Sequence, residues 1–315
     1  MGPAGLGAEP AVVDGSVEDV LGHHVDAGKI FRIARQAPSW LPKSSDGNRI
    51  EREGVAFGAV QGDVELTADR VLGARFRDAF SDPSFSAECV SVEGLGEHRP
   101  EHPHLAAHSL GRGLWYCVDP IDGSLNYLMR NGALGLPYAS CVTVLRRKDA
   151  ARFSDVLTAV IVDLRSGDHW SVRPMSEGSM TCLNDAPISL KGPDRLDLGR
   201  QIVIGEMYYP ENRAKIERAF AGKKGWLRNP GSAAYEMALV ASGTAVAYIC
   251  DRQKQHELGA GYALVKGAGG VAVDWDGQDL GPRAYDFASQ TPVILAANRA
   301  IADQVLELLR KAGEG

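Results

Sequence analysis

Asp119-Pro120-Ile121-Asp122-Gly123-Ser124 is the stretch that decides how this chain folds. It directly follows the apolar run 114–118, which is typical of a buried β-strand. Pro120 fixes the backbone where the chain turns, and Gly123 lets the backbone come close to a ligand. Two carboxylates held this close raise each other's pKa unless a cation lies between them, and Mg²⁺ prefers such oxygen ligands. Asp, Pro and Gly are also common in acidic surface turns, so the stretch alone leaves both readings open.

Further motifs along the chain favour the metal site. The stretch resembles the D-P-x-D-G-[TS] signature of the lithium-sensitive, Mg²⁺-dependent phosphatases, the superfamily of inositol monophosphatase and fructose-1,6-bisphosphatase. Downstream, 256–270 is similar to the family's helix that runs from W-D to E-A-G-G. Upstream, Gly96-Glu97 is similar to the family's G-E-E, and 67–69 lies where the family has T-x-x-D or L-D. The motifs occur in the family's order and cover roughly residues 55–275.

The resemblance implies the family's layered α-β-α-β-α sandwich, an α+β / α/β fold. The residue pattern independently predicts a mostly antiparallel sheet with strands at 89–92, 114–118, 140–145, 159–164 and 169–172. After residue 184 the pattern alternates, with strands expected at 202–205, 245–250, 271–275 and 293–296 and helices at 211–220, 232–241, 257–267 and 298–311. We therefore expect a disordered tail over 1–14, an α+β half over 15–185 and an α/β half over 186–315, with the cleft between the halves.

Two further helices are expected ahead of this sheet. Ser16 is a candidate N-cap for a helix that runs to about Ala37, because apolar residues recur on one face of that segment. Helical periodicity also covers 69–80. Between them, the polar and glycine-containing segment 38–62 fits a mobile loop over an active site.

The resemblance implies a set of metal ligands. Glu97, Asp119 and the carbonyl of Ile121 would hold one Mg²⁺, and Asp119, Asp122 and Glu257 would hold a second, so Asp119 bridges the two. Two such ions can activate a water and stabilise the leaving oxygen of a phosphate ester. Loss of any one of these ligands is expected to have a strong effect on the metal site.

Roles for the turn and for the preceding helix are also implied. The amides of Gly123 and Ser124 would hold the phosphate, because a turn of this kind directs N–H groups at an anion. The Ser124 hydroxyl, paired with Asp69, would orient or deprotonate the attacking water, and Thr67 joins them as a catalytic candidate. No covalent intermediate is implied.

Departures from the family pattern leave part of this set open. Glu257 stands where monophosphatases have Asp, but it keeps the charge and the bisphosphatase branch uses Glu there. Glu93 would replace Glu97 as a ligand if the bisphosphatase S-E-E were the better match, although the spacing to Asp119 favours Glu97. His98 stands in place of the second Glu of G-E-E, which weakens a third, loosely held Mg²⁺ beside the two.

Substrate identity is harder to predict, because the chain combines two patterns. Val60-Gln61-Gly62-Asp63 is similar to the bisphosphatase branch, whereas 228–243 is similar to the monophosphatases. Tyr208 and His256 are candidate substrate contacts, and His256 either protonates the leaving group or, as we prefer, forms part of the cleft wall. We expect a phosphoric monoester hydrolase that acts on an inositol, sugar or nucleotide phosphate. A sugar bisphosphatase, or a family member that binds a phosphorylated ligand or partner without hydrolysis, is the alternative.

Composition sets the remaining expectations. A formal charge of −6 over 315 residues argues against a protein that coats nucleic acid or a membrane surface, and no apolar run is long enough to span a bilayer. The five cysteines form no CxxC pair, and Cys89, Cys117, Cys141 and Cys250 lie in apolar runs typical of buried free thiols, so we expect a cytoplasmic protein. The resemblance also implies inhibition by Li⁺ and assembly as a homodimer or homotetramer. The expected binding partner is a small phosphate ester.

Overall fold

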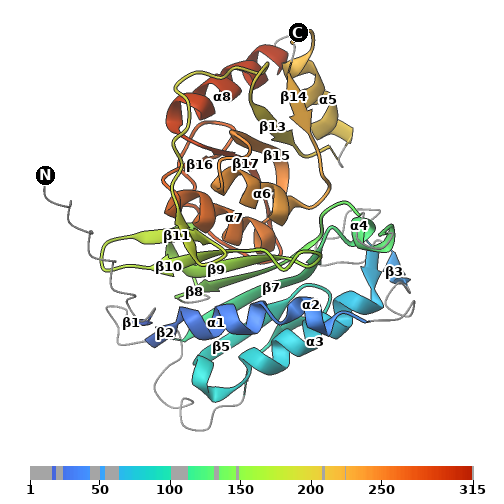
Figure 1. Cartoon of the computed structure of the whole chain (residues 1–315), viewed down its shortest axis with the longest axis vertical. Coiled ribbons are helices and arrows are strands. Elements are labelled where there is room, and N and C mark those ends of the chain that lie inside the picture. Colours follow the sequence, from blue (N-terminus) through green and yellow to red (C-terminus); the bar gives the residue numbers. More distant parts are fainter. Residues whose placement is uncertain are drawn as a thin grey trace, which may run out of the picture.

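Helices and two large sheets alternate in layers through the molecule (Figure 1). The computed structural model describes residues 16–18, 24–42, 50–53, 64–100, 113–130, 135–146, 149–207, 210–223 and 225–313. Outer helices cover one face of each sheet, and a central pair of helices lies between the sheets. The α-β-α-β-α sandwich expected from the sequence is confirmed.

The larger sheet has eight strands in the order β12-β11-β10-β9-β8-β7-β5-β6. Their bounds are β5 (Ala87–Val92), β6 (Gly96–His98), β7 (Leu114–Asp122), β8 (Ala139–Leu145), β9 (Val156–Asp163), β10 (His169–Pro174), β11 (Ser179–Leu183) and β12 (Ala186–Ile188). Only the β5–β7 pair is parallel among the neighbours in this sheet, so the expected mostly antiparallel sheet is confirmed. Strands β7 and β8 are buried at every position because helices cover both faces.

The smaller sheet has five strands in the order β14-β13-β15-β17-β16. Their bounds are β13 (Ile202–Gly205), β14 (Trp226–Arg228), β15 (Ala247–Lys254), β16 (Val271–Val273) and β17 (Gln290–Ala296). Its outer face is covered by α5 (Pro210–Phe220) and α8 (Arg299–Gly313). Strand β15 runs to Lys254, past the expected end at Cys250, through a register shift against β17. This extension delivers polar residues to the candidate site.

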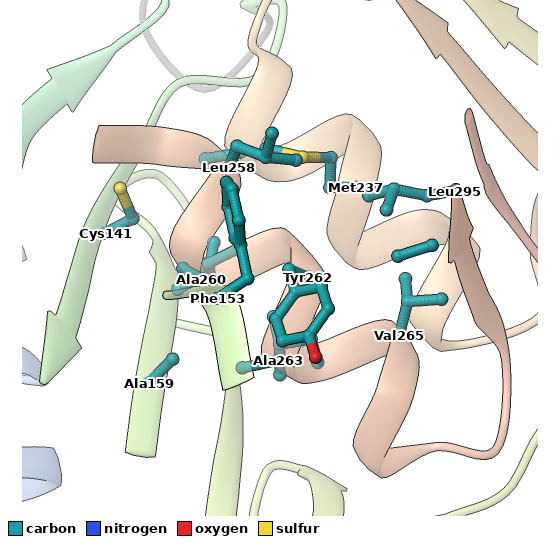
Figure 2. Packing of buried hydrophobic residues seen from close by; sticks show 14 of the residues in the cluster. Cys141, Phe153, Ala159, Met237, Leu258, Ala260, Tyr262, Ala263, Val265 and Leu295 are labelled. Atoms are coloured by element: carbon teal, nitrogen blue, oxygen red, sulfur yellow. The ribbon is translucent and has the colours of Figure 1, made fainter. Parts of the chain in front are cut away.

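The central layer consists of α6 (Ala233–Ala241) and α7 (Gln255–Gly267), and α7 is buried from its first residue through Val265. A side chain at Gly259 would come 2.9 Å from Thr143, and one at Gly261 would come 2.2 Å from the sulfur of Met237. Glycine in a helix costs about 1 kcal/mol, but here it lets α7 approach β8 and α6 closely. Figure 2 shows Tyr262 and Met237 within this tightly packed layer.

The third helical layer covers the other face of the larger sheet with α1 (Ala27–Ala34), α2 (Ala37–Trp40) and α3 (Thr67–Phe80). The expected helix from Ser16 is wrong at its start, since β1 (Ser16–Glu18) pairs there with β2 (His24–Asp26). Helix α1 begins only at Ala27, because the Asp26 carboxylate accepts a hydrogen bond from the Lys29 amide at 2.7 Å and caps the first turn. The helix expected at 69–80 is confirmed as α3.

The segment expected as one loop, 38–62, contains the end of α2 and β3 (Ile50–Glu53), which pairs with β4 (Val64–Leu66). The remainder of that segment, 43–49 and 54–62, lies outside the described residues, as does the expected tail over 1–14. All five cysteines are described, and all are buried and outside disulfides, as expected for Cys89, Cys117, Cys141 and Cys250. Among the described helices, none is long and apolar enough to cross a membrane. The division into halves at residue 185 stays a prediction.

Candidate metal centre

A β-bulge places Asp119 and Asp122 on the same side of β7. Asp119 pairs with Cys141 and Asp122 pairs with Ala139, so β7 has one residue more than β8 between these pairs. Residues three apart in a regular strand point to opposite faces, and the extra residue reverses this for the second carboxylate. Oxygens of both residues and of Glu257 accordingly lie within 4.8 Å of one another.

Asp122 also ties the larger sheet to the central layer. Its Oδ2 accepts hydrogen bonds from the Ser232 hydroxyl at 2.6 Å and from the Ala234 amide at 2.7 Å, at the start of α6. Burial raises the pKa of Asp122, and these two hydrogen bonds oppose that rise. The sequence placed Ser232 in a family motif but gave no sign of this contact.

Asp119 is 1% exposed, and neither of its carboxylate oxygens has a hydrogen-bond partner among the described residues. Burial, and then the charges of Glu93, Glu257 and Asp122, raise the pKa of Asp119 well above its usual value. A buried charge without a partner costs several kcal/mol. A divalent cation with carboxylate ligands would remove this cost, so the residues present fit a metal centre.

Glu257 is held in orientation by a chain of buried polar groups. The Gln253 amide donates a hydrogen bond to the Glu257 carboxylate, and the Tyr248 hydroxyl donates one to the Gln253 side-chain carbonyl. All three residues are buried. Groups behind a ligand fix its geometry, and mutation of such groups in metal sites typically weakens metal binding about 10–100-fold.

Glu93 lies in the cluster, whereas Glu97 does not. Glu93 directly follows β5, and one of its oxygens lies within 4.8 Å of ligand atoms of Asp119 and His256. Glu97 is exposed on the edge strand β6, paired with Ser91 in the β5–β6 hairpin. Spacing counted along the chain favoured Glu97 because it took no account of the hairpin, which reverses the chain between the two residues.

Two cationic or polar side chains face Glu93 from α7 and β15. The Lys254 ammonium donates to Glu93 Oε1 at 3.1 Å, and His256 Nε2 lies 3.4 Å from the same oxygen. Burial by itself would raise the pKa of Glu93, but Lys254 and His256 hold that pKa well below its usual value. Sequence reasoning missed Lys254. The available signal was the polar run 251–255, which follows an apolar strand and directly precedes His256.

The predicted catalytic pair is also close in space. The Ser124 hydroxyl donates to the Ile121 carbonyl at 2.9 Å and lies 3.5 Å from each oxygen of Asp69. Asp69 Oδ2 accepts a hydrogen bond from the Leu66 amide at 2.7 Å, near the start of α3. One turn later, Gly73 lets α3 approach β7, since a side chain there would come 3.3 Å from Pro120.

The other sequence-predicted residues fall in three places. Thr67 is the first residue of α3, two residues before Asp69. Gly123 has a φ of +84°, which favours glycine, and precedes the short helix α4 (Ser124–Leu128). Tyr208 lies outside the described residues.

Comparison with known proteins identifies the family of this chain. Residues 62–314 match the profile of the inositol monophosphatase family, and the chain therefore belongs to this family. "Nus factor SuhB" of Xylella fastidiosa is 29% identical over 246 residues, covering 76% of this chain and 84% of the relative. "Fructose-1,6-bisphosphatase/inositol-1-monophosphatase" of Archaeoglobus fulgidus is 24% identical over 229 residues, covering 71% of this chain and 81% of the relative.

Solved structures share the fold at lower sequence identity. The Thermotoga maritima IMPase superposes with a TM-score of 0.68 at 20% identity, covering 90% of this chain and 96% of its own. The extragenic suppressor protein SuhB from Bartonella henselae superposes with a TM-score of 0.69 at 18% identity, covering 90% of this chain and 98% of its own.

Proposed function

We propose that this protein is a Mg²⁺-dependent phosphatase that hydrolyses a small-molecule phosphate monoester. The observation that carries the proposal is Asp119, whose two buried oxygens have no hydrogen-bond partner among the described residues and face other carboxylates. A chain that only bound a partner protein would gain nothing from this costly arrangement. Membership of the inositol monophosphatase family makes phosphate ester hydrolysis the chemistry to test.

The proposed ligands form two sets that share Asp119. Asp119, Asp122 and Glu257 would hold one ion, since their oxygens already converge. Glu93, in place of Glu97, would hold the other with Asp119 and the carbonyl of Ile121. That carbonyl accepts the Ser124 hydroxyl and has a second lone pair for an ion. When bound, the ions supply activation of a water and neutralisation of the phosphate and leaving-oxygen charge.

The chain's own residues position the reactants. Ser124, between the Ile121 carbonyl and Asp69, would hold the attacking water in line with the phosphorus, and Asp69 would accept its proton. Thr67 would support Asp69 from the same helical turn. The backbone at Gly123 and Ser124 would receive the phosphate, because the first N–H groups of a helix have no partner within that helix.

The substrate class remains a small phosphate ester, with His256 and Tyr208 as proposed contacts. A sugar bisphosphatase is the nearest variant, and the bisphosphatase relative of Archaeoglobus fulgidus makes fructose 1,6-bisphosphate a necessary test substrate. A second candidate is a family member that binds without hydrolysis. Relatives named Nus factors are the reason to consider this candidate. The cluster of Asp119, Asp122 and Glu257 favours catalysis instead.

Phosphate release from a panel of esters tests the proposal. The panel contains inositol 1-phosphate, fructose 1,6-bisphosphate, histidinol phosphate, AMP and 3′-phosphoadenosine 5′-phosphate, each with Mg²⁺ or with EDTA. We expect Mg²⁺-dependent release from at least one ester, reduced about 10³-fold or more in Asp119→Asn. The exposed Asp78→Asn is the control and should retain the wild-type rate. Equal release with EDTA, or from Asp119→Asn, would contradict the mechanism.

Li⁺ gives an independent check on the same centre. It carries one charge and would compete for a position built for a divalent ion, so the rate should fall at about tens of millimolar Li⁺. NaCl at equal concentration controls for ionic strength. A rate that Li⁺ leaves unchanged would count against the proposed ligand arrangement.

A further inference from the structure

His256 presents a ring nitrogen to the carboxylate cluster. The residue is 1% exposed, near the start of α7, and its Nδ1 lies 3.1 Å from the Phe287 carbonyl oxygen. A carbonyl oxygen can only accept a hydrogen bond, so Nδ1 carries the proton and donates it. In the neutral imidazole, Nε2 is then left with a free lone pair.

That lone pair faces three anions. Nε2 lies 3.4 Å from Glu93 Oε1, 3.7 Å from Glu257 Oε1 and 3.9 Å from Asp119 Oδ2. It has no hydrogen-bond partner among the described residues. With Nε2 unprotonated, the arrangement is repulsive, and a cation bound between these atoms would relieve the repulsion.

The spacing suits ligands of one ion better than a hydrogen bond. Hydrogen bonds between nitrogen and oxygen are about 2.7–3.2 Å long, which is shorter than all three distances. Two ligand atoms that each lie about 2.0–2.2 Å from the same ion are themselves about 3.0–3.5 Å apart. The Nε2–Glu93 distance falls in this range, and a small side-chain movement brings Asp119 into it.

We infer that Glu93, Asp119 and His256 Nε2 form a mixed nitrogen and oxygen site that binds a divalent transition-metal ion, such as Mn²⁺, Fe²⁺, Co²⁺ or Zn²⁺, more tightly than Mg²⁺. Imidazole is a ligand for these ions, whereas Mg²⁺ is held by oxygen. The adjacent set Asp119, Asp122 and Glu257 contains only oxygen and stays suited to Mg²⁺. The inference rests on the proposed function, since Asp119 belongs to both sets.

Lys254 strengthens the preference of this site for a transition-metal ion over Mg²⁺. Its ammonium lies 3.1 Å from Glu93 Oε1 and neutralises part of the negative charge of this site. Mg²⁺ binding depends mainly on that charge, whereas a transition ion also gains from the nitrogen donor. The centre would therefore hold two different ions side by side.

Electron spin-echo spectroscopy of bound Mn²⁺ tests the inference directly. The full-length protein without an affinity tag is freed of metal with EDTA, dialysed and loaded with one equivalent of Mn²⁺. We expect modulation from a directly bound ¹⁴N nucleus, and its replacement by the ¹⁵N pattern when the protein is labelled with ¹⁵N-histidine. This result in the wild-type protein does not depend on the folding of any variant. Mn²⁺ that fails to bind, or that binds without nitrogen modulation, would overturn the inference.

Matched variants then assign the nitrogen. In His256→Gln the modulation should disappear and Mn²⁺ affinity should fall about 10–100-fold, while Mg²⁺ affinity changes less than about 3-fold. His98→Gln, on the exposed edge strand β6, should leave the modulation and the affinities for Mn²⁺ and Mg²⁺ unchanged. Modulation that persists in His256→Gln would show that another histidine is the ligand. Phosphate release separates the two proposals. If Mn²⁺ is bound through nitrogen but no ester is hydrolysed with any metal, the phosphatase function is contradicted and the mixed metal site is still supported.

Discussion

At the scale of the single residue, Asp119 is a buried carboxylate, proposed as a metal ligand, that is costly to the fold. Its folded pKa lies above its unfolded value of about 3.9. The native state therefore binds more protons than the unfolded state between these two values, and its contribution to stability falls as pH rises through them. A bound cation would remove this penalty. The metal-free protein should carry more of this penalty as pH rises.

Asp119→Asn should consequently raise the stability of the metal-free protein. At about pH 7.5 in EDTA, we expect a higher midpoint of thermal unfolding than in wild type, by about 2 °C for each kcal/mol of relieved repulsion. The difference should shrink toward about pH 4, where the wild-type carboxyl is protonated as well. Differential scanning fluorimetry across this pH range measures it, with Asp78→Asn as the exposed control. A less stable Asp119→Asn at about pH 7.5 would refute the argument.

Ser124 provides a second residue-scale prediction, on catalysis. Its hydroxyl bridges the Ile121 carbonyl and Asp69, so Ser124→Ala should lower kcat about 10²-fold or more with little change in KM. Ser124→Thr keeps the hydroxyl and should remain within about 10-fold of wild type. Steady-state kinetics with the best ester of the panel measures both. Equal losses in the two variants would point to packing rather than to the hydroxyl.

At the scale of the element, helix α7 links the core to the site. Glycines at 259 and 261 bring it close to β8 and α6, and this contact sets the depth at which Glu257 meets the carboxylates of β7. The geometry of the candidate site therefore depends on the packing of a helix whose first turn carries Glu257, a proposed ligand. A helix displaced by one side chain would move Glu257 with it.

Gly261→Ala should destabilise the protein by about 1–3 kcal/mol, because the new methyl group would lie 2.8 Å from Met237 Cβ and 2.2 Å from its sulfur. Chemical denaturation measures the loss. Gly313→Ala, at a position with open space around it, is the control and should change stability little. In Gly261→Ala/Met237→Ala, part of the loss should be recovered, since the two sites are in contact. Strict additivity of the two losses would contradict the proposed clash.

At the scale of the whole molecule, the candidate centre joins segments that are far apart in the chain. Glu93 follows β5, the two aspartates lie on the β7 bulge, and Glu257 lies in the first turn of α7 in the central layer. An ion held between them would stabilise the larger sheet against α7, and unfolding would release it. Metal binding should therefore stabilise the entire fold.

Mg²⁺ at about 100 times its dissociation constant should stabilise the wild-type protein by about 2.7 kcal/mol, which is an increase of about 5 °C in the unfolding midpoint. Asp119→Asn should lose most of this increase, while Asp78→Asn should keep it. Thermal scans with Mg²⁺, with EDTA and with NaCl at equal ionic strength measure the effect. An equal increase in Asp119→Asn would indicate a general salt effect.

The sequence by itself determined the family, the layered fold and most of the helices and strands. These follow from local patterns: apolar runs mark β7 and β8, helical periodicity marks α3, and the turn at Asp119 to Ser124 marks the site. The same patterns misplaced the first helix. Asp26 caps α1, and residues before it pair as strands β1 and β2. This pairing depends on contact between two segments, which the pattern within either segment does not reveal.

Only the tertiary structure decided which carboxylate lies beside Asp119 and which cationic side chain faces that carboxylate. The hairpin after β5 carries Glu97 to an exposed edge and leaves Glu93 in the cluster. The bulge in β7 turns Asp122 to the side of Asp119, and the extension of β15 delivers Lys254 to Glu93. Each of these depends on how strands pair across the sheet, because electrostatic contacts depend on distance in space, and sequence spacing does not determine that distance once a chain reverses direction.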